Sequence, residues 1–521
     1  MMKTHLWMIE ALKILILMIR IALIFFLKNF GCTWYHYSNQ GYPFKIIPFL
    51  SWVYYLKNTK KEKWNQLACL KELIDQQPED KKIIIFNSAK NNSKADILLF
   101  DIKFIKDFIK KEKEGNFIKN GGDLNQISDN LHNKLIRKVN PKFFKVEHIS
   151  KNIPKIYKIL EKHIKKAFDN GNDNSCQTLD LRQVIKNANE EIVDKILFGF
   201  QKNKEVKKVK EEKLSNLSTQ IFTLKQKLSM NRFNKLFCEY PEKLGLLKNA
   251  RELKRVKKLA ENKIWEEFNK ICQKKDLNEE DGVIGMIAKY KLEENPNMTR
   301  DEVVKNINGF YVGVEDTLIS ATSGAFFNLI HNPEYIEKLR KSIKKTVWKN
   351  GYHPESLSIE DLQKSELLDL IFKETLRISG PAIMSAPRIA VKDVTLVSDK
   401  NKNQIKIRKG DRVILGNTLK SQLKCYFENP LKFIPERHNN ENKRNIKGYS
   451  TTPFLYGTRG CVGKNMAENL LKISIVCVMD HLEFLEYEPK EIKGDKMILD
   501  PFYTPENVWV RAGFIKKFQE N

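Results

Sequence analysis

One cysteine stands in a loop whose composition suits metal binding. Cys461 lies in a glycine-rich loop, residues 453–463, that runs into an apolar helical pattern near Lys464. Free backbone N–H groups at a helix N-terminus and the neighbouring Arg459 are surroundings that lower the pKa of a thiol. Because the thiolate is the form of cysteine that binds metals, the loop predicts a metal-binding thiolate at Cys461.

Two acids and a hydroxyl lie in the middle of a long apolar pattern. Glu315, Asp316 and Thr317 follow Gly313 closely. Glycine lets a ligand plane approach the backbone because it has no side chain, and acids beside it could relay protons. An isolated acidic pair is more often a solvated helix face, so these residues alone leave both interpretations open.

The helices that position these residues are predicted from hydrophobic periodicity. Thr299 and Glu302 form a capping-box pattern, which predicts a helix over residues 299–330. At about 1.5 Å per residue this helix is roughly 45 Å long, which suits a helix that crosses a whole domain. A second amphipathic helix is expected over residues 366–378.

A charged pair lies in this second helix. Glu374 and Arg377 stand three residues apart, so they are close enough to pair on one helical turn. Any charged helix contains several such pairs. On these grounds alone, a surface ion pair is the simplest interpretation.

The rest of the chain is mostly helical, with two β regions. Residues 127–327 show almost only helical periodicity, which predicts a mainly α fold. The expected strands of the β regions are residues 82–86, 95–100, 391–397, 404–407 and 412–415. Helices are expected beside the first region at residues 64–74 and 103–110.

The overall composition describes a large globular chain. It has 521 residues, 41% hydrophobic content and a formal net charge of +28. The lysines are scattered among acids and asparagines along nearly every segment, so the charge does not indicate a nucleic-acid partner. The eight cysteines form no CxxC pair, which argues against a zinc site and a disulfide framework and favours a reducing, cytosol-facing location.

The N-terminal segment is strongly apolar. Residues 1–30 are predicted to be a membrane anchor, although Arg20 inside the run is costly in a bilayer and leaves an interfacial helix or a buried first helix as alternatives. Residues 31–59 hold aromatics and prolines and are expected to form a stiff linker. Residues 60–521 are then expected to form a single catalytic domain.

The Cys461 loop resembles the haem-thiolate motif of the cytochrome P-450 family, Phe-x-x-Gly-x-Arg-x-Cys-x-Gly. The matching positions are Phe454, Gly457, Arg459, Cys461 and Gly463. Three further family elements occur in the family's order: a Glu-x-x-Arg helix, a Pro-Glu-Arg segment and a long distal helix. Glu374 and Arg377 form the Glu-x-x-Arg pattern, Arg437 ends the Pro-Glu-Arg segment, and Gly313 lies in the long helix. Four ordered motifs arise by chance far more rarely than one.

The resemblance implies a fold and a cofactor. The fold is the mainly α cytochrome P-450 fold, a large helical region with a long central distal helix and a small β-rich region. Haem b would lie between the distal helix and the Cys461 loop. Cys461 would be the axial ligand of the iron, and Phe454 would shield its sulfur from solvent.

The resemblance also implies roles for the charged residues. Arg459, Arg388 and Arg137 would be propionate partners, since an arginine fork suits a carboxylate. The contact from the early helix rests on Arg137 alone, because Asn133 stands where the family usually has tryptophan. Glu374, Arg377 and Arg437 would form a structural ion-pair network behind the haem.

The distal helix departs from the family pattern. Gly313 and Glu315 align with the family's glycine and acid, but Asp316 falls at the usual threonine position and Thr317 comes one residue late. Asp316 would then replace the hydroxyl, or a local helix bulge would let Asp316 and Thr317 act as the acid–alcohol pair. The sequence leaves both possibilities open.

The implied function is a monooxygenase of the endoplasmic reticulum membrane whose catalytic domain faces the cytosol. It would insert one oxygen atom of O₂ into a hydrophobic substrate. Electrons would come from a separate NADPH-dependent flavoprotein reductase, with a cytochrome b-type protein as a second candidate donor. A peroxide isomerase or dehydratase of the same fold, which needs no reductase, is the alternative that the Asp316 position motivates. A non-catalytic basic membrane protein or nucleic-acid binder is a third hypothesis.

Overall fold

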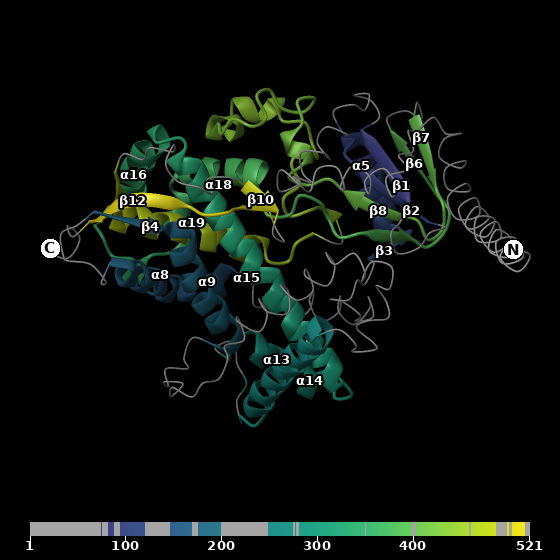
Figure 1. Ribbon diagram of the computed structural model, residues 1–521, viewed down its shortest axis with the longest axis horizontal. Coiled ribbons are helices and arrows are strands. Elements are labelled where there is room, and N and C mark those ends of the chain that lie inside the picture. Colours follow the sequence, from purple (N-terminus) through teal and green to yellow (C-terminus); the bar gives the residue numbers. More distant parts are fainter. Residues whose placement is uncertain are drawn as a thin grey trace, which may run out of the picture. The chain divides into compact units, whose positions relative to one another are not determined.

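The structure of the chain is a computed structural model. It describes residues 74, 82–87, 94–119, 146–168, 176–199, 248–274, 277, 281–349, 351–398, 403–457, 460–485, 497–499 and 503–515. The chain divides into two compact units, each assembled from separate stretches of sequence. The first unit comprises Met1–Asn120, Ala382–Lys432 and Glu441–Gly460, and the second comprises Gly121–Pro381, Phe433–Asn440 and Cys461–Asn521. Strands are prominent in the first unit and helices in the second (Figure 1).

The first unit is built on a five-stranded sheet. β1 (Ile83–Asn87) and β2 (Ala95–Leu99) form an antiparallel hairpin, and β2 pairs in parallel with β8 (Arg412–Leu415). β8 then pairs with β5 (Arg388–Ala390), which pairs with β3 (Phe117–Lys119) at the other edge. All five residues of β2 are buried, as expected for a strand in the interior of a sheet with both faces covered.

One helix and a hairpin cover this sheet. α5 (Ile102–Lys113) begins at Asp101, whose carboxylate accepts hydrogen bonds from the N–H groups of Lys103 and Phe104. Its apolar side chains join the buried core of the sheet, and α5 also contacts the hairpin of β6 (Val394–Ser398) and β7 (Asn403–Ile407). The short 3₁₀ helices η5 (Lys420–Gln422) and η7 (Asn442–Asn445) complete the described elements of this unit.

The second unit contains most of the described helices. They are α8 (Val146–Phe168), α9 (Leu181–Phe198), α13 (Lys248–Cys272), α14 (Gly282–Glu293), α15 (Arg300–Ile330), α16 (Glu334–Thr346), α17 (Ile359–Gln363), α18 (Glu366–Ser379), α19 (Lys464–His481), η3 (Pro354–Ser356) and η6 (Pro435–His438). Its strands are β4 (Gln177–Asp180), β9 (Leu482–Phe484), β10 (Met497–Leu499), β11 (Tyr503–Pro505) and β12 (Trp509–Phe514), in the sheets β4–β12–β9 and β10–β11.

α15 is the longest described helix and the axis of the second unit. It begins at a capping box, in which Glu302 N–H donates to Thr299 Oγ1 at 3.3 Å and Thr299 N–H donates to Glu302 Oε2 at 2.8 Å. It packs against α9, α18 and α19, and Figure 1 shows it running through this unit. The residues of α15 are therefore held from several sides by other helices.

The predicted elements agree with the structure where it describes them, with one correction. The helices at 103–110, 299–330 and 366–378, the helix that starts near Lys464, and four of the five strands are confirmed within a few residues. The strand expected from residue 391 begins only at Val394, because residues 391–393 form a bend after β5. The three-residue strands β3 and β5 were not predicted, since such short segments show too little periodicity.

The N-terminal predictions lie outside the described residues. This applies to the anchor at 1–30, the linker at 31–59 and the helix at 64–74, except for its last residue. Within the part of the chain that the structure describes, no helix is both long and apolar enough to cross a membrane.

One lysine is completely buried in the first unit. The side chain of Lys420 in η5 has 0% exposure, and its Nζ donates to Thr452 Oγ1 at 3.1 Å. Burial lowers the pKa of this amine to about 7, because a charged ammonium is unfavourable away from water. Lys420 therefore lowers the stability of the folded chain at neutral pH.

Replacement of Lys420 by methionine is expected to stabilise the protein. The unfolded chain binds a proton at Lys420 up to about pH 10.4, whereas the folded chain releases it near 7, so the wild-type free energy of unfolding rises with pH between these values. The stabilisation by Lys420→Met is expected to be on the order of 3 kcal/mol at neutral pH and to shrink toward about pH 10. Chemical denaturation at several pH values measures it.

The exposed neighbour Lys424 provides the control for this experiment. Lys424→Met is expected to change stability by less than about 0.5 kcal/mol. If Lys420→Met instead destabilises the protein at neutral pH, the hydrogen bond to Thr452 outweighs the cost of burying the amine.

Candidate active site

The loop that leads to Cys461 is anchored in the first unit. Leu455 and Gly457 adopt positive φ values of 58° and 79°. Leu455 packs against the core of the sheet, and a side chain at Gly457 would approach Ile109 Cγ2 of α5 to 3.1 Å. A non-glycine residue at positive φ is uncommon, and its cost persists only where the surroundings enforce it. The path of the chain before Cys461 is therefore fixed by α5 and the sheet core.

Cys461 itself belongs to the second unit and stands just before α19. It is an exposed residue, and its Sγ accepts a hydrogen bond from the backbone N–H of Gly463. Burial by the surrounding protein raises the pKa of the thiol above its ordinary value, and the Gly463 N–H only partly opposes this. The expectation of a lowered pKa is thus wrong for the protein alone, because one backbone donor does not offset the loss of solvent around the sulfur.

The structure describes some of the other residues predicted for this site and not others. Gly463 lies against Cys461, since a Cβ on it would be 3.9 Å from Sγ. Phe454 is half-buried in the first unit, and its role beside the sulfur stays a prediction. Arg459 and the more distant Arg137 lie outside the described residues.

Glu374 and Arg377 form a fully buried ion pair on α18. Arg377 Nε and Nη2 each donate to one oxygen of the Glu374 carboxylate at 2.8 Å, and both side chains have 0% exposure. This two-point geometry is the strongest form of such a pair. The pair predicted from the i,i+3 spacing is therefore internal, and the surface interpretation is wrong.

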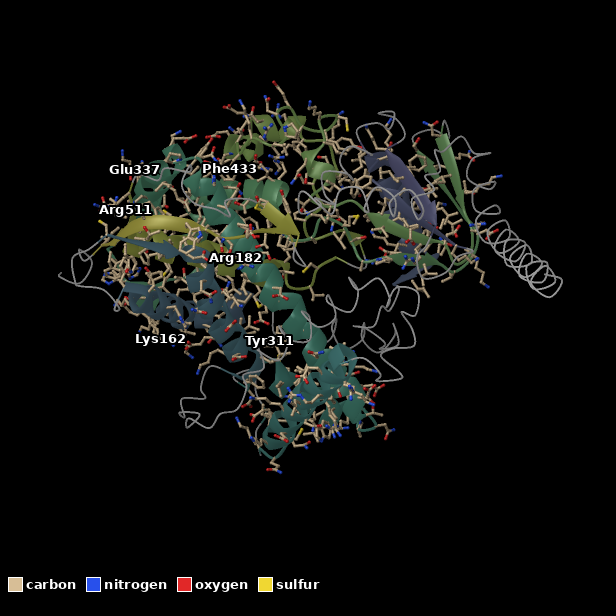
Figure 2. All side chains as sticks on the ribbon, in the orientation of Figure 1. Lys162, Arg182, Tyr311, Glu337, Phe433 and Arg511 are labelled. Carbon is tan, nitrogen blue, oxygen red and sulfur yellow. The ribbon has the colours of Figure 1, made fainter. Side chains whose placement is uncertain are left out.

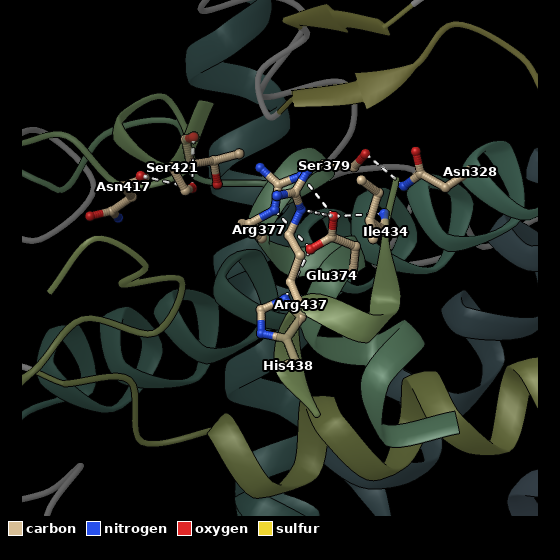
Figure 3. Close-up of polar contacts among 10 residues, drawn as sticks. Asn328, Glu374, Arg377, Ser379, Asn417, Ser421, Ile434, Arg437 and His438 are labelled. Atoms are coloured by element: carbon tan, nitrogen blue, oxygen red, sulfur yellow. Dashed lines mark hydrogen bonds and ion pairs between the residues drawn. The ribbon is translucent and has the colours of Figure 1, made fainter. Parts of the chain in front are cut away.

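Three groups from η6 and the residue before it complete the environment of Glu374 (Figure 3). Ile434 N–H donates to Oε1 at 2.9 Å, Arg437 Nε lies 3.4 Å from Oε1, and His438 Nε2 lies 2.9 Å from Oε2. Burial raises the pKa of Glu374, but the bonds from Arg377, His438 and Ile434 outweigh it and hold the pKa below its usual range. The predicted network with Arg437 is present, and it ties η6 to α18.

His438 is the member of this network that was not predicted from the sequence. It directly follows Arg437, but it is 64 positions from Glu374 along the chain. On the other side of η6, Tyr335 of α16 donates to Glu436 Oε2 at 2.6 Å and stacks edge-to-face on Phe433. Both sides of this turn are thus fixed to helices of the second unit.

Gly313 leaves an open position on α15. It is exposed, and an added Cβ would have no atom within 4 Å outside the neighbouring backbone. At about 100° per residue, Asp316 and Thr317 lie within about 60° of Gly313 around the helix axis, whereas Glu315 lies about 200° away. Asp316 and Thr317 therefore share the side of Gly313, and Glu315 points away from it.

Thr317 and Glu315 differ in their contacts. Thr317 Oγ1 donates to the carbonyl oxygen of Gly313 at 2.8 Å and also lies 3.3 Å from that of Val314. α15 is α-helical from Arg300 to Ile330, so the helix contains no bulge at this point. Glu315 is buried with 3% exposure, which overturns the solvated-face interpretation for this residue.

Arg388 is buried in the first unit and is already paired. Its Nε donates to Glu112 Oε1 of α5 at 2.6 Å, and its Nη1 donates to the carbonyl oxygen of Ala386 at 2.7 Å. Glu112 was not predicted, because it is 276 positions away. A propionate at Arg388, which stays a prediction, would have to share the guanidinium with Glu112.

These residues fit a thiolate-held planar cofactor. The Cys461 sulfur with its backbone donor supplies a ligand, and the open position at Gly313 supplies room beside a helix backbone. Within the described residues, no group of three or more His, Cys, Asp or Glu side chains could hold a metal ion directly. The candidate ligand among the residues described here is the Cys461 sulfur.

The sequence matches the family described as Cytochrome P450 over residues 94–505. This match covers well over half of the chain. The chain therefore belongs to the cytochrome P450 family, whose cofactor is haem b and whose fold is mainly helical with a small β region.

The individual relatives are distant and are matched in part. The chain is 27% identical to Cytochrome P450 9b2 of Drosophila melanogaster over 214 residues, which is 40% of this chain and 41% of the relative. It is 31% identical to Cytochrome P450 3A7 of Homo sapiens over 35% of this chain and 34% of the relative. It is 28% identical to Probable cytochrome P450 513F1 of Dictyostelium discoideum over 38% of this chain and 37% of the relative. These matches span about two fifths or less of the relatives' own length.

Proposed function

We propose that this protein is a haem-thiolate monooxygenase that inserts one oxygen atom of O₂ into a hydrophobic organic substrate. The observation that carries the proposal is the free Cys461 thiol just before α19, in a chain of the cytochrome P450 family that keeps the buried Glu374–Arg377 pair. Haem held by a cysteine thiolate supplies O₂ activation, because the thiolate pushes electron density toward O–O cleavage.

Each remaining residue has a role beside this cofactor. Cys461 would hold the iron, with the Gly463 N–H oriented at the sulfur. Gly313 would leave room for the cofactor plane. The network of Glu374, Arg377 and Arg437, together with His438, would keep η6 fixed to α18 and would not react.

Asp316 and Thr317 are the proposed acid–alcohol pair. Both lie on the Gly313 side of a regular helix, so the pair needs no bulge and Asp316 does not have to replace the hydroxyl. The Thr317 hydroxyl is oriented by the Gly313 carbonyl, and its lone pairs can accept a hydrogen bond from water. The Asp316 carboxylate can hold the same water or pass it a proton.

The partners and location follow from the charge and the sequence. Electrons would come from an NADPH-dependent flavoprotein reductase or a cytochrome b-type donor, and the net charge of +28 suits an acidic docking partner. The predicted N-terminal anchor supports a location at the endoplasmic reticulum membrane, with the catalytic domain in the cytosol. The described cysteines are free thiols, as expected on a reducing side of the membrane.

Dependence of the reaction on NADPH distinguishes a monooxygenase from a peroxide isomerase or dehydratase. Purified full-length protein is mixed with flavoprotein reductase, NADPH and fatty acids, sterols or small aromatics that shift its haem spectrum. An NADPH-dependent oxygenated product is expected. Turnover of a lipid hydroperoxide without NADPH, and no NADPH-dependent product, would instead identify a peroxide isomerase or dehydratase.

Replacement of Thr317 by valine is expected to uncouple NADPH consumption from product. Valine keeps the shape of threonine but removes the hydroxyl that donates to the Gly313 carbonyl. Product formed per NADPH is expected to fall about tenfold, while spectral binding of the substrate stays unchanged. Thr346→Val is the control, because the Thr346 hydroxyl on α16 likewise donates to the carbonyl oxygen four residues before it, that of Ser342. Equal yields for wild type and Thr317→Val would remove the hydroxyl from the proposal.

A further inference from the structure

Lys420 has unusual surroundings for a lysine. Most described lysines are at least partly exposed, as Lys162 of α8 is with 56% of its side chain in water (Figure 2). Lys472 of α19 is buried, but its Nζ donates to carboxylate oxygens of Asp369 at 2.9 Å and Glu468 at 2.8 Å. Lys420 is 0% exposed, and burial is the single cause that lowers its pKa. Among the described residues, its amine therefore has no carboxylate to offset the cost of burial.

The Lys420 amine is instead used to hold one hydroxyl. Its Nζ donates to Thr452 Oγ1 at 3.1 Å, and this hydroxyl donates to Asn417 Oδ1 at 3.4 Å. Thr452 and Asn417 are both buried, and all three residues belong to the first unit. A methionine at position 420 would fill about the same space without burying an amine. What lysine adds at this position is therefore the hydrogen-bond donor to Thr452.

Thr452 is the residue where the loop toward Cys461 begins to turn. Its carbonyl oxygen accepts a hydrogen bond from Leu455 N–H at 3.0 Å, which closes a tight turn. Further along the loop, Gly460 N–H donates to the carbonyl oxygen of Gly457 at 3.2 Å. Gly460 is the residue directly before Cys461. The loop is thus tied to itself at two points, which leaves it little slack between Thr452 and the cysteine.

Backbone strain gathers on both sides of Thr452. Among the described residues, three non-glycine residues have a positive φ, and two of them are Tyr449 at 65° and Leu455 at 58°. Both pack against the sheet core of the first unit, and the ring of Tyr449 also stacks edge-to-face on Tyr456 at 5.2 Å. Strained conformations persist where the surroundings enforce them, and they concentrate at functional sites. The segment that Lys420 holds is therefore one whose exact path matters.

We propose that Lys420 is a positioning residue for the iron ligand: its buried amine fixes Thr452 and, through it, the start of the loop that presents Cys461. Lys420 acts only through Thr452 and does not react. A local choice that lowers stability is expected where function requires it. The role rests on the proposed function, because the position of the loop matters to catalysis only if the Cys461 thiolate holds haem iron.

The spectrum of the reduced carbon monoxide complex tests this role in Lys420→Met. Full-length wild-type holoprotein is expected to show the Soret band of a thiolate-held iron. In Lys420→Met, this band is expected to convert to one without thiolate about fivefold faster, because Thr452 loses its donor. The same variant is expected to resist denaturant better than wild type. A purely structural role would move both properties in the same direction. An unchanged rate of conversion would overturn the inference.

Thr452→Val removes the other partner of the same hydrogen bond. Valine keeps the shape of threonine but leaves the Lys420 amine without its acceptor, so this variant is expected to be less stable than wild type. It should nevertheless speed the loss of the thiolate band about as much as Lys420→Met does. The double variant should be no faster than either single variant, because both remove one interaction. Lys424→Met, on an exposed side chain, is the control with the wild-type rate. Additive effects in the double variant would show that the two residues act separately and would overturn the inference.

Amide hydrogen exchange separates this inference from the proposed function, because it needs no cofactor signal. In the full-length protein, the N–H groups of Leu455 and Gly460 are expected to exchange about fivefold faster in Lys420→Met than in wild type. Faster exchange in a protein that shows no thiolate band would overturn the proposed function and the ligand role with it, while the hold of Lys420 on the loop stands. A thiolate band in wild type, with exchange and conversion unchanged in Lys420→Met, would overturn the role of Lys420 alone.

Discussion

Replacement of Glu374 by glutamine is expected to lower the free energy of unfolding by about 3–5 kcal/mol. The substitution keeps the shape of the side chain but leaves the guanidinium of Arg377, which has 0% exposure, without its counter-charge. It also weakens the contacts to His438 and Arg437, which hold η6 against α18. Denaturant unfolding of the full chain measures the change.

The pH dependence gives this prediction a second measurement. Because the folded-state pKa of Glu374 is lowered, its stabilisation is present above the unfolded value near 4.5 and is lost as the pH falls through the folded pKa. The difference between wild type and Glu374→Gln should therefore narrow in acid. Glu360→Gln, on the exposed side of α17, is the control and should be within about 0.5 kcal/mol of wild type. Equal losses in both variants would show that the buried pair does not stabilise the fold.

Replacement of Cys461 by alanine is expected to remove catalysis. The variant loses the sulfur that the Gly463 N–H orients, and the methyl group of alanine cannot bind a metal. NADPH-dependent product is expected to fall to background, a loss of more than about 1,000-fold, because every later step depends on the ligand. Haem content per chain should fall as well.

The matched control uses another partly exposed cysteine. Cys272, at the end of α13, is a free thiol that no proposed role includes. Cys272→Ala is expected to keep the wild-type haem content and turnover. Turnover by Cys461→Ala at the level of Cys272→Ala would contradict the assignment of Cys461 as the iron ligand.

Local patterns explain which parts of the fold could be predicted. The start of α15 follows from Thr299 and Glu302, which satisfy each other across one turn. The Glu374–Arg377 contact follows from i,i+3 spacing, and the pairing of β1 with β2 follows from two short apolar runs separated by a polar segment of sequence. In each case the residues that decide the structure are near one another in the chain.

Burial and long-range partners explain what could not be predicted. Tertiary packing brings Glu112 to Arg388 and His438 to Glu374, and no local sequence pattern encodes these contacts. The complete burial of Lys420 and the raised pKa of Cys461 are also products of packing. On α15, the motif alignment could not decide whether Asp316 replaces the threonine or a helix bulge is present. The regular helix of the structure places both Asp316 and Thr317 on the Gly313 side.

The absorption spectrum of the reduced carbon monoxide complex of the wild-type protein tests the central claim most directly. A haem iron held by the Cys461 thiolate predicts a Soret band at the position characteristic of thiolate ligation. Full-length protein that binds no haem, or a band at the position of imidazole-ligated haem, would contradict it.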